Sequence, residues 1–171
     1  MTSGGADDIL RVEILGPQHD RSGFASGVGP LDRYFQTQAG QDARKKMAAP
    51  FVLVLKDGSI AGYYTLSSTA VRLPELPEAV VRKLPRYPLI PATLLGRLAA
   101  DQRYQGRGYG RFLLADALYR AASNEIASFA VIVDAKDESA KRFYERESFL
   151  PFPDQPLKLF RPMADIEALF K

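Results

Sequence analysis

Hydrophobic and polar positions along this chain follow two periods, one typical of strands and one typical of helices. Apolar runs rich in β-branched or aromatic residues predict strands at residues 10–15, 51–56, 60–67, 92–100, 129–133 and 157–160. Apolar positions at helical spacing predict helices at residues 31–47, 78–84, 111–122 and 138–146. A hairpin turn at Asp57 and Gly58 and a helix cap at Asp137 fit this order. The pattern therefore predicts an α/β or α+β fold with one central mixed sheet.

A glycine-rich turn joins the fourth expected strand to the helix after it, where residues 105–110 read Gln-Gly-Arg-Gly-Tyr-Gly. Glycine tolerates positive φ and lets the backbone approach a ligand closely. The first N–H groups of the following helix point at the same place, at the positive end of the helix dipole. This geometry favours a phosphate group. Arg103, Arg107 and Arg111 add positive charge around the turn.

The spacing of the glycines narrows the choice of phosphate ligand. It differs from the G-x-x-x-x-G-K-[ST] loop that binds nucleoside triphosphates. It also fits a dinucleotide fingerprint poorly, because Arg111 stands where a third small residue is needed for close helix packing. From these six residues alone, a strand-to-helix connection that binds no ligand stays open as an alternative.

Composition limits the chemistry that the chain can use. Its 171 residues suit a single domain over 1–171, and we expect residues 1–8 to be flexible. The absence of cysteine excludes disulfides and thiolate ligands, and His19 is the single histidine, so no metal site is expected. No apolar stretch approaches the roughly 20 residues of a membrane span, and the N-terminus does not resemble a signal peptide. We therefore expect a cytoplasmic protein without a membrane segment.

Positive charge is concentrated in the middle third of the chain. Residues 61–120 hold 9 basic and 4 acidic side chains, whereas residues 1–60 hold 7 of each and residues 121–171 hold 7 basic and 9 acidic. The excess surrounds the glycine-rich turn and suits a polyanionic ligand or substrate. A basic face that is simply solvated explains the composition equally well.

Two motifs of the chain, one at the glycine-rich turn and one about 30 residues later, resemble motifs of the GNAT superfamily of N-acetyltransferases. Gln105, Gly108 and Gly110 fit the Q/R-x-x-G-x-G/A turn that holds the pyrophosphate of acetyl-CoA in that family. About 30 residues later, Ala-Lys-Arg-Phe-Tyr ending at Tyr144 resembles the A-x-x-F-Y of the family's last major helix. The resemblance implies a GNAT fold over residues 8–163, with a mostly antiparallel mixed sheet of about six to seven strands. Helices would flank the sheet, which would be splayed at the strand before the turn.

A narrower resemblance covers nearly the whole chain. Segments at residues 24–32, 61–68, 84–88, 94–99 and 133–137 look like the acetyltransferase toxins of type II toxin–antitoxin modules. The resemblance implies acetylation of the α-amino group of aminoacyl-tRNA, a block of translation, a ribbon-helix-helix antitoxin and a homodimer. The chain departs from the family at Ser148, where glycine is usual before Phe149. If this position needs positive φ, serine must accept strain or the turn must change.

The resemblance also assigns the residues that hold acetyl-CoA. The pyrophosphate would lie against Arg103, Gln105, Gly106, Arg107, Gly108, Tyr109, Gly110 and Arg111. The pantetheine arm would pair with the backbone of Leu98, Ala99 and Ala100, where one N–H can polarise the thioester oxygen. Tyr144 would protonate the leaving thiolate, because a phenol with a pKa of about 10 is protonated at neutral pH. Helical spacing alone would make Tyr144 a core aromatic.

The strand before the turn contains no carboxylate that could act as a general base. A lysine substrate, with a pKa of about 10.4, would need such a base. An α-amine has a pKa of about 7.7–8.0, and esterification to tRNA lowers it further, so an aminoacyl ester needs little help. The absence therefore favours the ester, although Asp134 is a candidate base from another strand.

Basic residues outside the turn are candidates for phosphate contacts with tRNA. They are Arg44, Lys45, Lys46, Arg82, Lys83, Arg86 and Arg97. Each of them alone is better explained as a solvated surface charge than as a tRNA contact. Tyr63 and Tyr64 alternate on one strand, so we expect one to face the core and the other a substrate cleft.

Two other functions stay open at this point. A GNAT enzyme could instead acetylate a small amine or a protein N-terminus, although the basic middle third and the missing base count against this. A non-catalytic module could bind CoA or a protein partner, but the intact turn together with Tyr144 argues for an enzyme.

Overall fold

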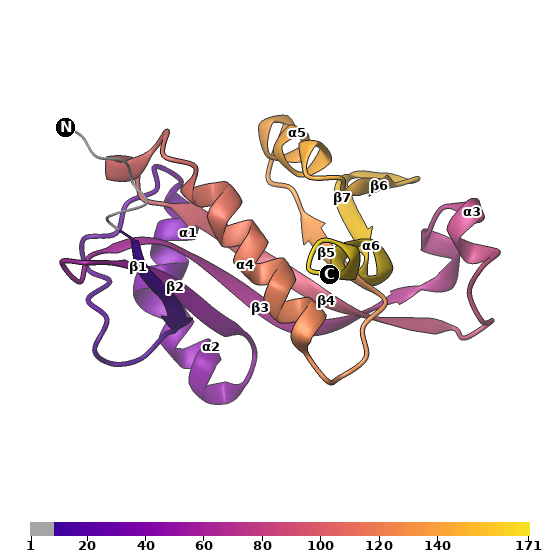
Figure 1. Cartoon of the computed structure of the whole chain (residues 1–171), viewed down its shortest axis with the longest axis horizontal. Helices are drawn as coiled ribbons and strands as arrows, with labels where there is room; N and C mark the ends of the chain where they lie inside the picture. Colours follow the sequence, from indigo (N-terminus) through magenta and orange to yellow (C-terminus); the bar gives the residue numbers. More distant parts are fainter. Residues whose placement is uncertain (1–8) are drawn as a thin grey trace. The chain divides into compact units, whose positions relative to one another are not determined.

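A computed structural model describes residues 9–171, in which strands and helices are interspersed along the chain (Figure 1). Contacts divide the chain into two compact units, each built from two separated stretches. The first unit comprises the described residues up to Ser67 together with Gly96–Ala117. The second comprises Ser68–Leu95 and Leu118–Lys171. The residues expected to be flexible, 1–8, lie outside the described part of the chain.

Three elements contribute residues to both units. They are the strands β3 (Ile60–Arg72) and β4 (Leu89–Ala100) and the helix α4 (Tyr109–Ser123). Both strands are longer than the hydrophobic pattern predicts, and α4 begins two residues earlier, at Tyr109. Within residues 9–171, the seven strands have the order β1-β2-β3-β4-β5-β7-β6, which confirms the expected mixed sheet.

An antiparallel meander and a helical segment build the first unit. β1 (Ile9–Ile14) pairs with β2 (Ala49–Leu55), which pairs in turn with β3. The predicted helix at 31–47 is a continuous helical segment made of α1 (Gly29–Arg33), the π-turn η2 (Tyr34–Gln38) and α2 (Ala39–Lys45). It ends because Lys46 adopts a left-handed conformation with φ 63°.

Aromatic side chains fill the core of the first unit. The Tyr63 ring stacks on Phe35 with 4.3 Å between centroids, and Phe24 packs edge-on against both. The Tyr63 hydroxyl donates to the Leu31 carbonyl at 2.8 Å, which anchors the helical segment to β3. Tyr64 stacks on Phe51 and donates to the Asp116 carboxylate at 2.6 Å. Both tyrosines are fully buried, so the expectation that one faces an open cleft is wrong.

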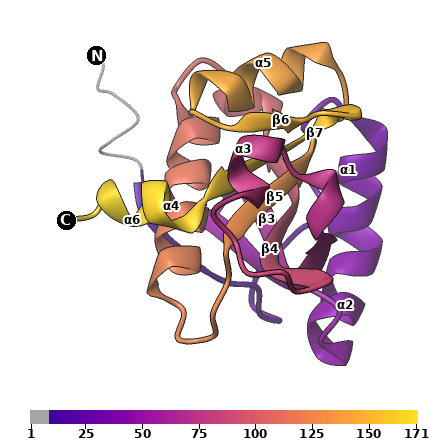
Figure 2. The same cartoon turned by 90° about the vertical axis from the view of Figure 1, so that its right-hand side faces the viewer.

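The second unit contains the parts of β3, β4 and α4 that lie outside the first unit, together with further strands and several short helices. β4 pairs in parallel with β5 (Ala130–Asp134) at Thr93–Leu95 and continues to Ala100 beyond this paired stretch, as expected for a strand that diverges before the turn. β5 pairs antiparallel with β7 (Gln155–Pro162), which forms a hairpin with β6 (Leu150–Phe152). α5 (Glu138–Arg146) has the predicted bounds and runs alongside β6 and β7 (Figure 2).

The hydrophobic pattern missed two short elements of the second unit. β6 has three residues and includes Pro151, so it carries no alternating signal. α6 (Met163–Ala168) follows Pro162 and buries only Met163 and Ile166. α3 (Glu78–Val81) is shorter than the helix predicted at 78–84. Among the described residues, no helix is long and apolar enough to cross a bilayer.

Candidate active site

The glycine-rich turn lies in the first unit, between the end of β4 and the start of α4 (Figure 1). Gly106 and Gly108 have φ values of 83° and 79°, a region that residues with a Cβ adopt at a cost. Apart from chain neighbours, no heavy atom of the described residues lies within 4 Å of a Cβ built on either glycine. The turn therefore has the backbone and the open side that a ligand cradle needs.

The first turn of α4 supplies hydrogen-bond donors to the same place. The first helical hydrogen bond runs from the Phe112 N–H to the Gly108 carbonyl at 3.0 Å. The N–H groups of Tyr109 and Gly110 precede it and have no intrahelical acceptor. With the positive end of the helix dipole behind them, these groups fit an anionic diphosphate.

Asp101 holds the chain between β4 and the turn, a role that sequence reasoning missed. Its carboxylate is 1% exposed and accepts hydrogen bonds from the Ala25 N–H at 3.1 Å and the Arg103 N–H at 2.9 Å. Arg103 also donates to it through Nε at 3.0 Å and Nη2 at 3.1 Å. Burial opposes ionisation, but the hydrogen bonds from Arg103 and Ala25 keep the pKa of Asp101 below its ordinary value.

This ion pair occupies part of the Arg103 guanidinium, and the expected contact of Arg103 with the cofactor stays a prediction. Its guanidinium is bound to Asp101 and lies 5.2 Å from the ring of Tyr104. Arg107 approaches the same ring at 5.4 Å, and the Tyr104 hydroxyl is 3.1 Å from the Ser59 hydroxyl. Tyr104 thus connects the two arginines to the β2–β3 hairpin. In the sequence, Asp101 is a single carboxylate between an apolar strand and a basic turn. That position was the available signal that its side chain supports the turn.

The strand residues expected to hold the pantetheine arm lie at the end of β4. Ala99 is buried, whereas Leu98 and Ala100 are half-buried. A Cβ built on Gly62 would lie 2.8 Å from the Ala99 carbonyl and 2.6 Å from Leu113 Cδ1, so β3 approaches β4 closely here. The pairing of these residues with a cofactor stays a prediction.

Tyr144 lies on α5 in the second unit. Asp137 caps this helix by accepting a hydrogen bond from the Ala140 N–H at 2.8 Å, as expected. The Tyr144 ring is 8% exposed and packs edge-on against Phe143 and Phe149, at 5.1 Å and 5.4 Å between centroids. Burial raises the pKa of the Tyr144 phenol. The hydroxyl is therefore protonated at neutral pH, as a general acid requires.

The turn after α5 contains Ser148, the serine that stands where the family usually has glycine. Ser148 adopts φ 69°, so it occupies the left-handed conformation that glycine would adopt without strain. Phe149 N–H donates to the Tyr144 carbonyl at 3.1 Å, and buried Arg161 donates to the Glu147 carbonyl at 3.1 Å. Ser148 therefore adopts positive φ and accepts the strain of that conformation.

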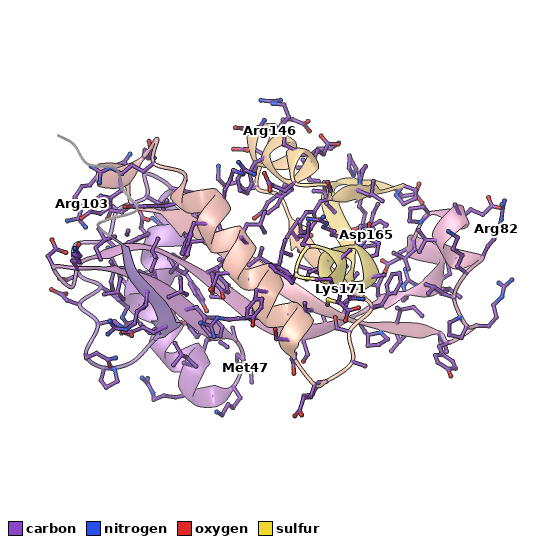
Figure 3. All side chains as sticks on the ribbon, in the orientation of Figure 1. Met47, Arg82, Arg103, Arg146, Asp165 and Lys171 are labelled. Carbon is purple, nitrogen blue, oxygen red and sulfur yellow. The ribbon has the colours of Figure 1, made fainter. Side chains whose placement is uncertain are left out.

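The seven candidate tRNA contacts are divided between the units. Arg44, Lys45 and Lys46 are exposed at the end of α2 in the first unit. Arg97, also in the first unit, stacks its guanidinium 3.5 Å from the centre of the Tyr34 ring. The remaining three, Arg82, Lys83 and Arg86, are exposed beyond α3 in the second unit, and Figure 3 labels Arg82. Arg82 pairs with Glu78 at 3.1 Å.

Arg97 belongs to a packed cluster rather than to an open basic surface. The Tyr34 hydroxyl beneath it donates to Asp42 at 2.8 Å. Burial, followed by this hydrogen bond to the carboxylate, raises the pKa of Tyr34 to about 12. Asp134, the candidate base, is exposed at the end of β5, and its role stays a prediction.

Comparison with known proteins matches residues 20–149 to the acetyltransferase (GNAT) family. A probable toxin TacT of Sinorhizobium fredii is 32% identical over 169 residues, which cover 92% of this chain and 93% of that protein. A tRNA-acetylating toxin of Mycobacterium tuberculosis is 36% identical over 152 residues, which cover 88% and 90%.

Solved structures of related toxins share the fold over nearly the full chain. AtaT complexed with acetyl-methionyl-tRNAfMet superposes with a TM-score of 0.87 at 31% identity, covering 96% of this chain and 100% of that one. AtaTR bound with AcCoA has a TM-score of 0.84 at 31% identity, covering 96% and 99%. A mutant AtaT bound to the C-terminus of the antitoxin AtaR has a TM-score of 0.82 at 29% identity, covering 96% and 99%.

Proposed function

The chain belongs to the GNAT family of acetyltransferases, and on this premise we propose that it transfers acetyl from acetyl-CoA to the α-amino group of an aminoacyl-tRNA. Acetylation of that amine removes the nucleophile of peptide-bond formation, so the protein would act as a toxin that blocks translation. The tRNA-acetylating toxin and the AtaT complex with acetyl-methionyl-tRNAfMet support this choice of substrate. The reaction would take place in the cytoplasm, where aminoacyl-tRNA is used.

The observation that carries the proposal is the open cradle at the start of α4. Gly106 and Gly108 turn the backbone through left-handed conformations, and apart from their chain neighbours no described atom lies within 4 Å of a Cβ built on either glycine. The N–H groups of Tyr109 and Gly110 lie directly after them. Backbone donors at a helix N-terminus hold a diphosphate without needing a metal ion or a lysine. This fits the pyrophosphate of acetyl-CoA, whose reactive thioester supplies the acetyl group.

The chemistry asks little more of the protein than positioning and one proton. The neutral α-amine attacks the thioester carbonyl, the new C–N bond forms, and the C–S bond breaks. The departing thiolate takes the proton of the Tyr144 hydroxyl, and the nitrogen loses its own proton to solvent or a nearby base. Tyr144 then recovers a proton from water. The raised pKa of Tyr144 suits this role, because the residue starts every cycle protonated.

The proposal extends to two protein partners. AtaT is bound to the C-terminus of the antitoxin AtaR, which supports a neutralising antitoxin for this chain as well. We assign that antitoxin to the ribbon-helix-helix class and the active toxin to a homodimer, on the resemblance of the sequence to type II acetyltransferase toxins.

The decisive experiment incubates the protein with labelled acetyl-CoA and charged total tRNA. We expect label on the aminoacyl end of charged tRNA and none on deacylated tRNA, which lacks the amine. Mass spectrometry of the released aminoacyl adenosine then identifies the amino acid. Label on small amines or protein N-termini without label on any tRNA would contradict the proposal and favour the alternative substrate classes.

A further inference from the structure

An exposed segment of the second unit combines an aromatic ring with several cations. It comprises residues 82–89, between α3 and the start of β4, and is called here the 82–89 segment. Arg82, Lys83 and Arg86 are exposed, and Tyr87 is 62% exposed. This combination is unusual for a solvated loop, because a large aromatic ring gains by burial.

The backbone of the 82–89 segment is held in place. Lys83 and Leu84 donate N–H bonds back to α3 at 3.0 Å and 3.1 Å, and the Pro88 carbonyl accepts from the Leu73 N–H at 3.3 Å. Leu84 packs against the core of the unit. Pro85 and Pro88 restrict the chain on both sides of Arg86 and Tyr87. The ring is therefore presented from an ordered backbone, which lowers the entropy lost on binding.

The side chains at the centre of the segment have no partner among the described residues. Neither Lys83, Arg86 nor Tyr87 makes a side-chain hydrogen bond, an ion pair or a ring contact within that part of the chain. The other exposed tyrosine of this unit, Tyr119, differs because its ring packs edge-on against Phe170 at 5.2 Å between centroids. Tyr87 therefore has no hydrogen-bond or ring partner among the described residues, and most of its surface is exposed.

We propose that Tyr87 stacks on an unpaired base of the RNA substrate while Lys83 and Arg86 contact the adjoining phosphates. An unpaired nucleotide offers both a flat face for the ring and negative charge for the cations. A base inside a duplex offers no free face, so stacking restricts the contact to the single-stranded 3′ end or a loop of tRNA. The inference rests on the proposed function and adds a base-stacking residue to it.

Three substitutions separate stacking from charge and from hydroxyl contacts. Tyr87→Leu keeps bulk and removes the ring, so we expect the KM for charged tRNA to rise roughly 5- to 100-fold, with kcat at saturation unchanged. Tyr87→Phe keeps the ring and should stay within about threefold of the wild type. Tyr119→Leu, a matched change at an exposed tyrosine outside the segment, should leave this KM unchanged.

The salt dependence of tRNA binding gives a second readout. Tyr87→Leu should lower affinity equally at every salt concentration and leave the slope of log K against log salt unchanged. Replacing Lys83 and Arg86 together by Gln should flatten that slope by about 1.5, since each phosphate contact contributes roughly 0.7 to 0.9. A merely structural role of Tyr87 would not produce this separation.

Acceptor-stem RNAs with and without the single-stranded 3′ end distinguish the two sources of the base. Weaker binding of Tyr87→Leu than of the wild type to the RNA that has the 3′ end, with equal binding of both proteins to the blunt RNA, places the ring at the 3′ end. Weaker binding of Tyr87→Leu to full-length tRNA that lacks this end places the ring at a loop. Equal tRNA KM for Tyr87→Leu and wild type, or equal defects in Tyr87→Leu and Tyr87→Phe, would overturn the inference. Acetylation of an amino-acid methyl ester controls for folding, and a wild type that labels no tRNA would defeat the proposed function instead.

Discussion

Several single residues of this chain adopt a positive φ, which glycine adopts freely and other residue types adopt only with strain. Gly106 and Gly108 adopt positive φ without strain, whereas Ser148 adopts φ 69° with a side chain attached. The left-handed conformation costs a residue with a Cβ roughly 1–2 kcal/mol. Ser148 stores this strain four residues after Tyr144, in the turn that ends α5.

Replacing Ser148 by Gly should relieve that strain. We expect Ser148→Gly to raise the free energy of unfolding by about 0.5–1 kcal/mol, because the gain exceeds the extra entropy of glycine in the unfolded chain. Denaturant unfolding measures the change. Lys141→Gly, within the regular turns of α5, is the matched control and should lower stability by about 1 kcal/mol. A loss of stability in Ser148→Gly would show that the serine side chain makes a compensating contact.

Removing the Tyr144 hydroxyl should separate catalysis from binding. Tyr144→Phe keeps the ring packed against Phe143 and Phe149 but eliminates the proton donor. We expect kcat to fall about 100-fold or more, since general acids contribute roughly 10²–10⁴. The Kd for acetyl-CoA, measured by calorimetry, should stay within about twofold. Since the pKa of Tyr144 is raised, the wild type should show no loss of kcat from pH 7 to about pH 9. Unchanged kcat in the mutant would remove Tyr144 from the mechanism.

At the scale of elements, the connection from β4 through the glycine-rich turn to α4 depends on a buried charge, the carboxylate of Asp101. Asp101 fixes the exit of β4 through Ala25 and fixes the start of the turn through Arg103. The backbone supports this arrangement, because the Asp101 N–H donates to Ala61 at 2.9 Å and the Gln102 N–H donates to Ala25 at 2.8 Å. The conformation of the glycine-rich turn is thereby tied to the β3 strand and to the loop before α1.

Asp101→Asn should lower the stability of the protein, and the size of this loss should depend on pH. Both carboxylate oxygens of Asp101 accept hydrogen bonds from N–H donors. In the asparagine variant, the side-chain NH₂ would replace one of these oxygens and would face an N–H donor instead of accepting from it. We expect a loss of about 1.5–3 kcal/mol in unfolding free energy at pH 7 and a higher KM for acetyl-CoA.

The sign of the pH effect follows from the lowered pKa of Asp101, which makes the unfolded chain bind more protons near its own pKa of about 3.9. The stabilisation is therefore present at neutral pH and disappears as the pH falls below about 4. Unfolding curves at pH 7 and pH 3.5 test this, and Asp154→Asn at an exposed turn is the control. An equal loss at both pH values would contradict the role of the ionised carboxylate.

For the whole molecule, the distribution of charge matters more than the net charge of +3. Exposed cations occur at the end of α2 in one unit and beyond α3 in the other. Each is a weak signal alone, but a polyanion that contacts several of them releases several counterions. Affinity for tRNA should therefore fall steeply with salt, whereas affinity for a small amine would not.

Charge reversal at both sites tests this distribution. We expect Lys45→Glu with Lys46→Glu, and separately Arg82→Glu with Lys83→Glu, to weaken tRNA binding at least tenfold at physiological salt and to flatten its salt dependence. Filter binding across a salt series measures both quantities. Arg142→Glu with Arg146→Glu on α5 makes the same change in net charge outside the basic third of the chain. Equal losses in all three double mutants would indicate a general charge effect rather than two contact sites.

Local signals in the sequence determined the elements and the cradle. α5 was predicted with its exact bounds because Asp137 caps it and its apolar positions recur at helical spacing. The glycine-rich turn was identified because positive φ restricts the choice of residue, and this requirement is visible without any tertiary contact. The short elements β6 and α6 were not predicted, because three to six residues are too few to show a hydrophobic period.

Contacts between distant residues were decided by the tertiary structure alone. Asp101 meets Ala25 across 76 positions of sequence, Arg97 stacks on Tyr34, and Tyr64 bonds to Asp116 in α4. No periodicity or propensity encodes such pairs, since they exist only after strands and helices have packed. The sequence therefore determined which chemistry the chain can perform at its glycine-rich turn. The tertiary structure decided which charges support that turn, which are bound within the core, and which stay exposed for a substrate.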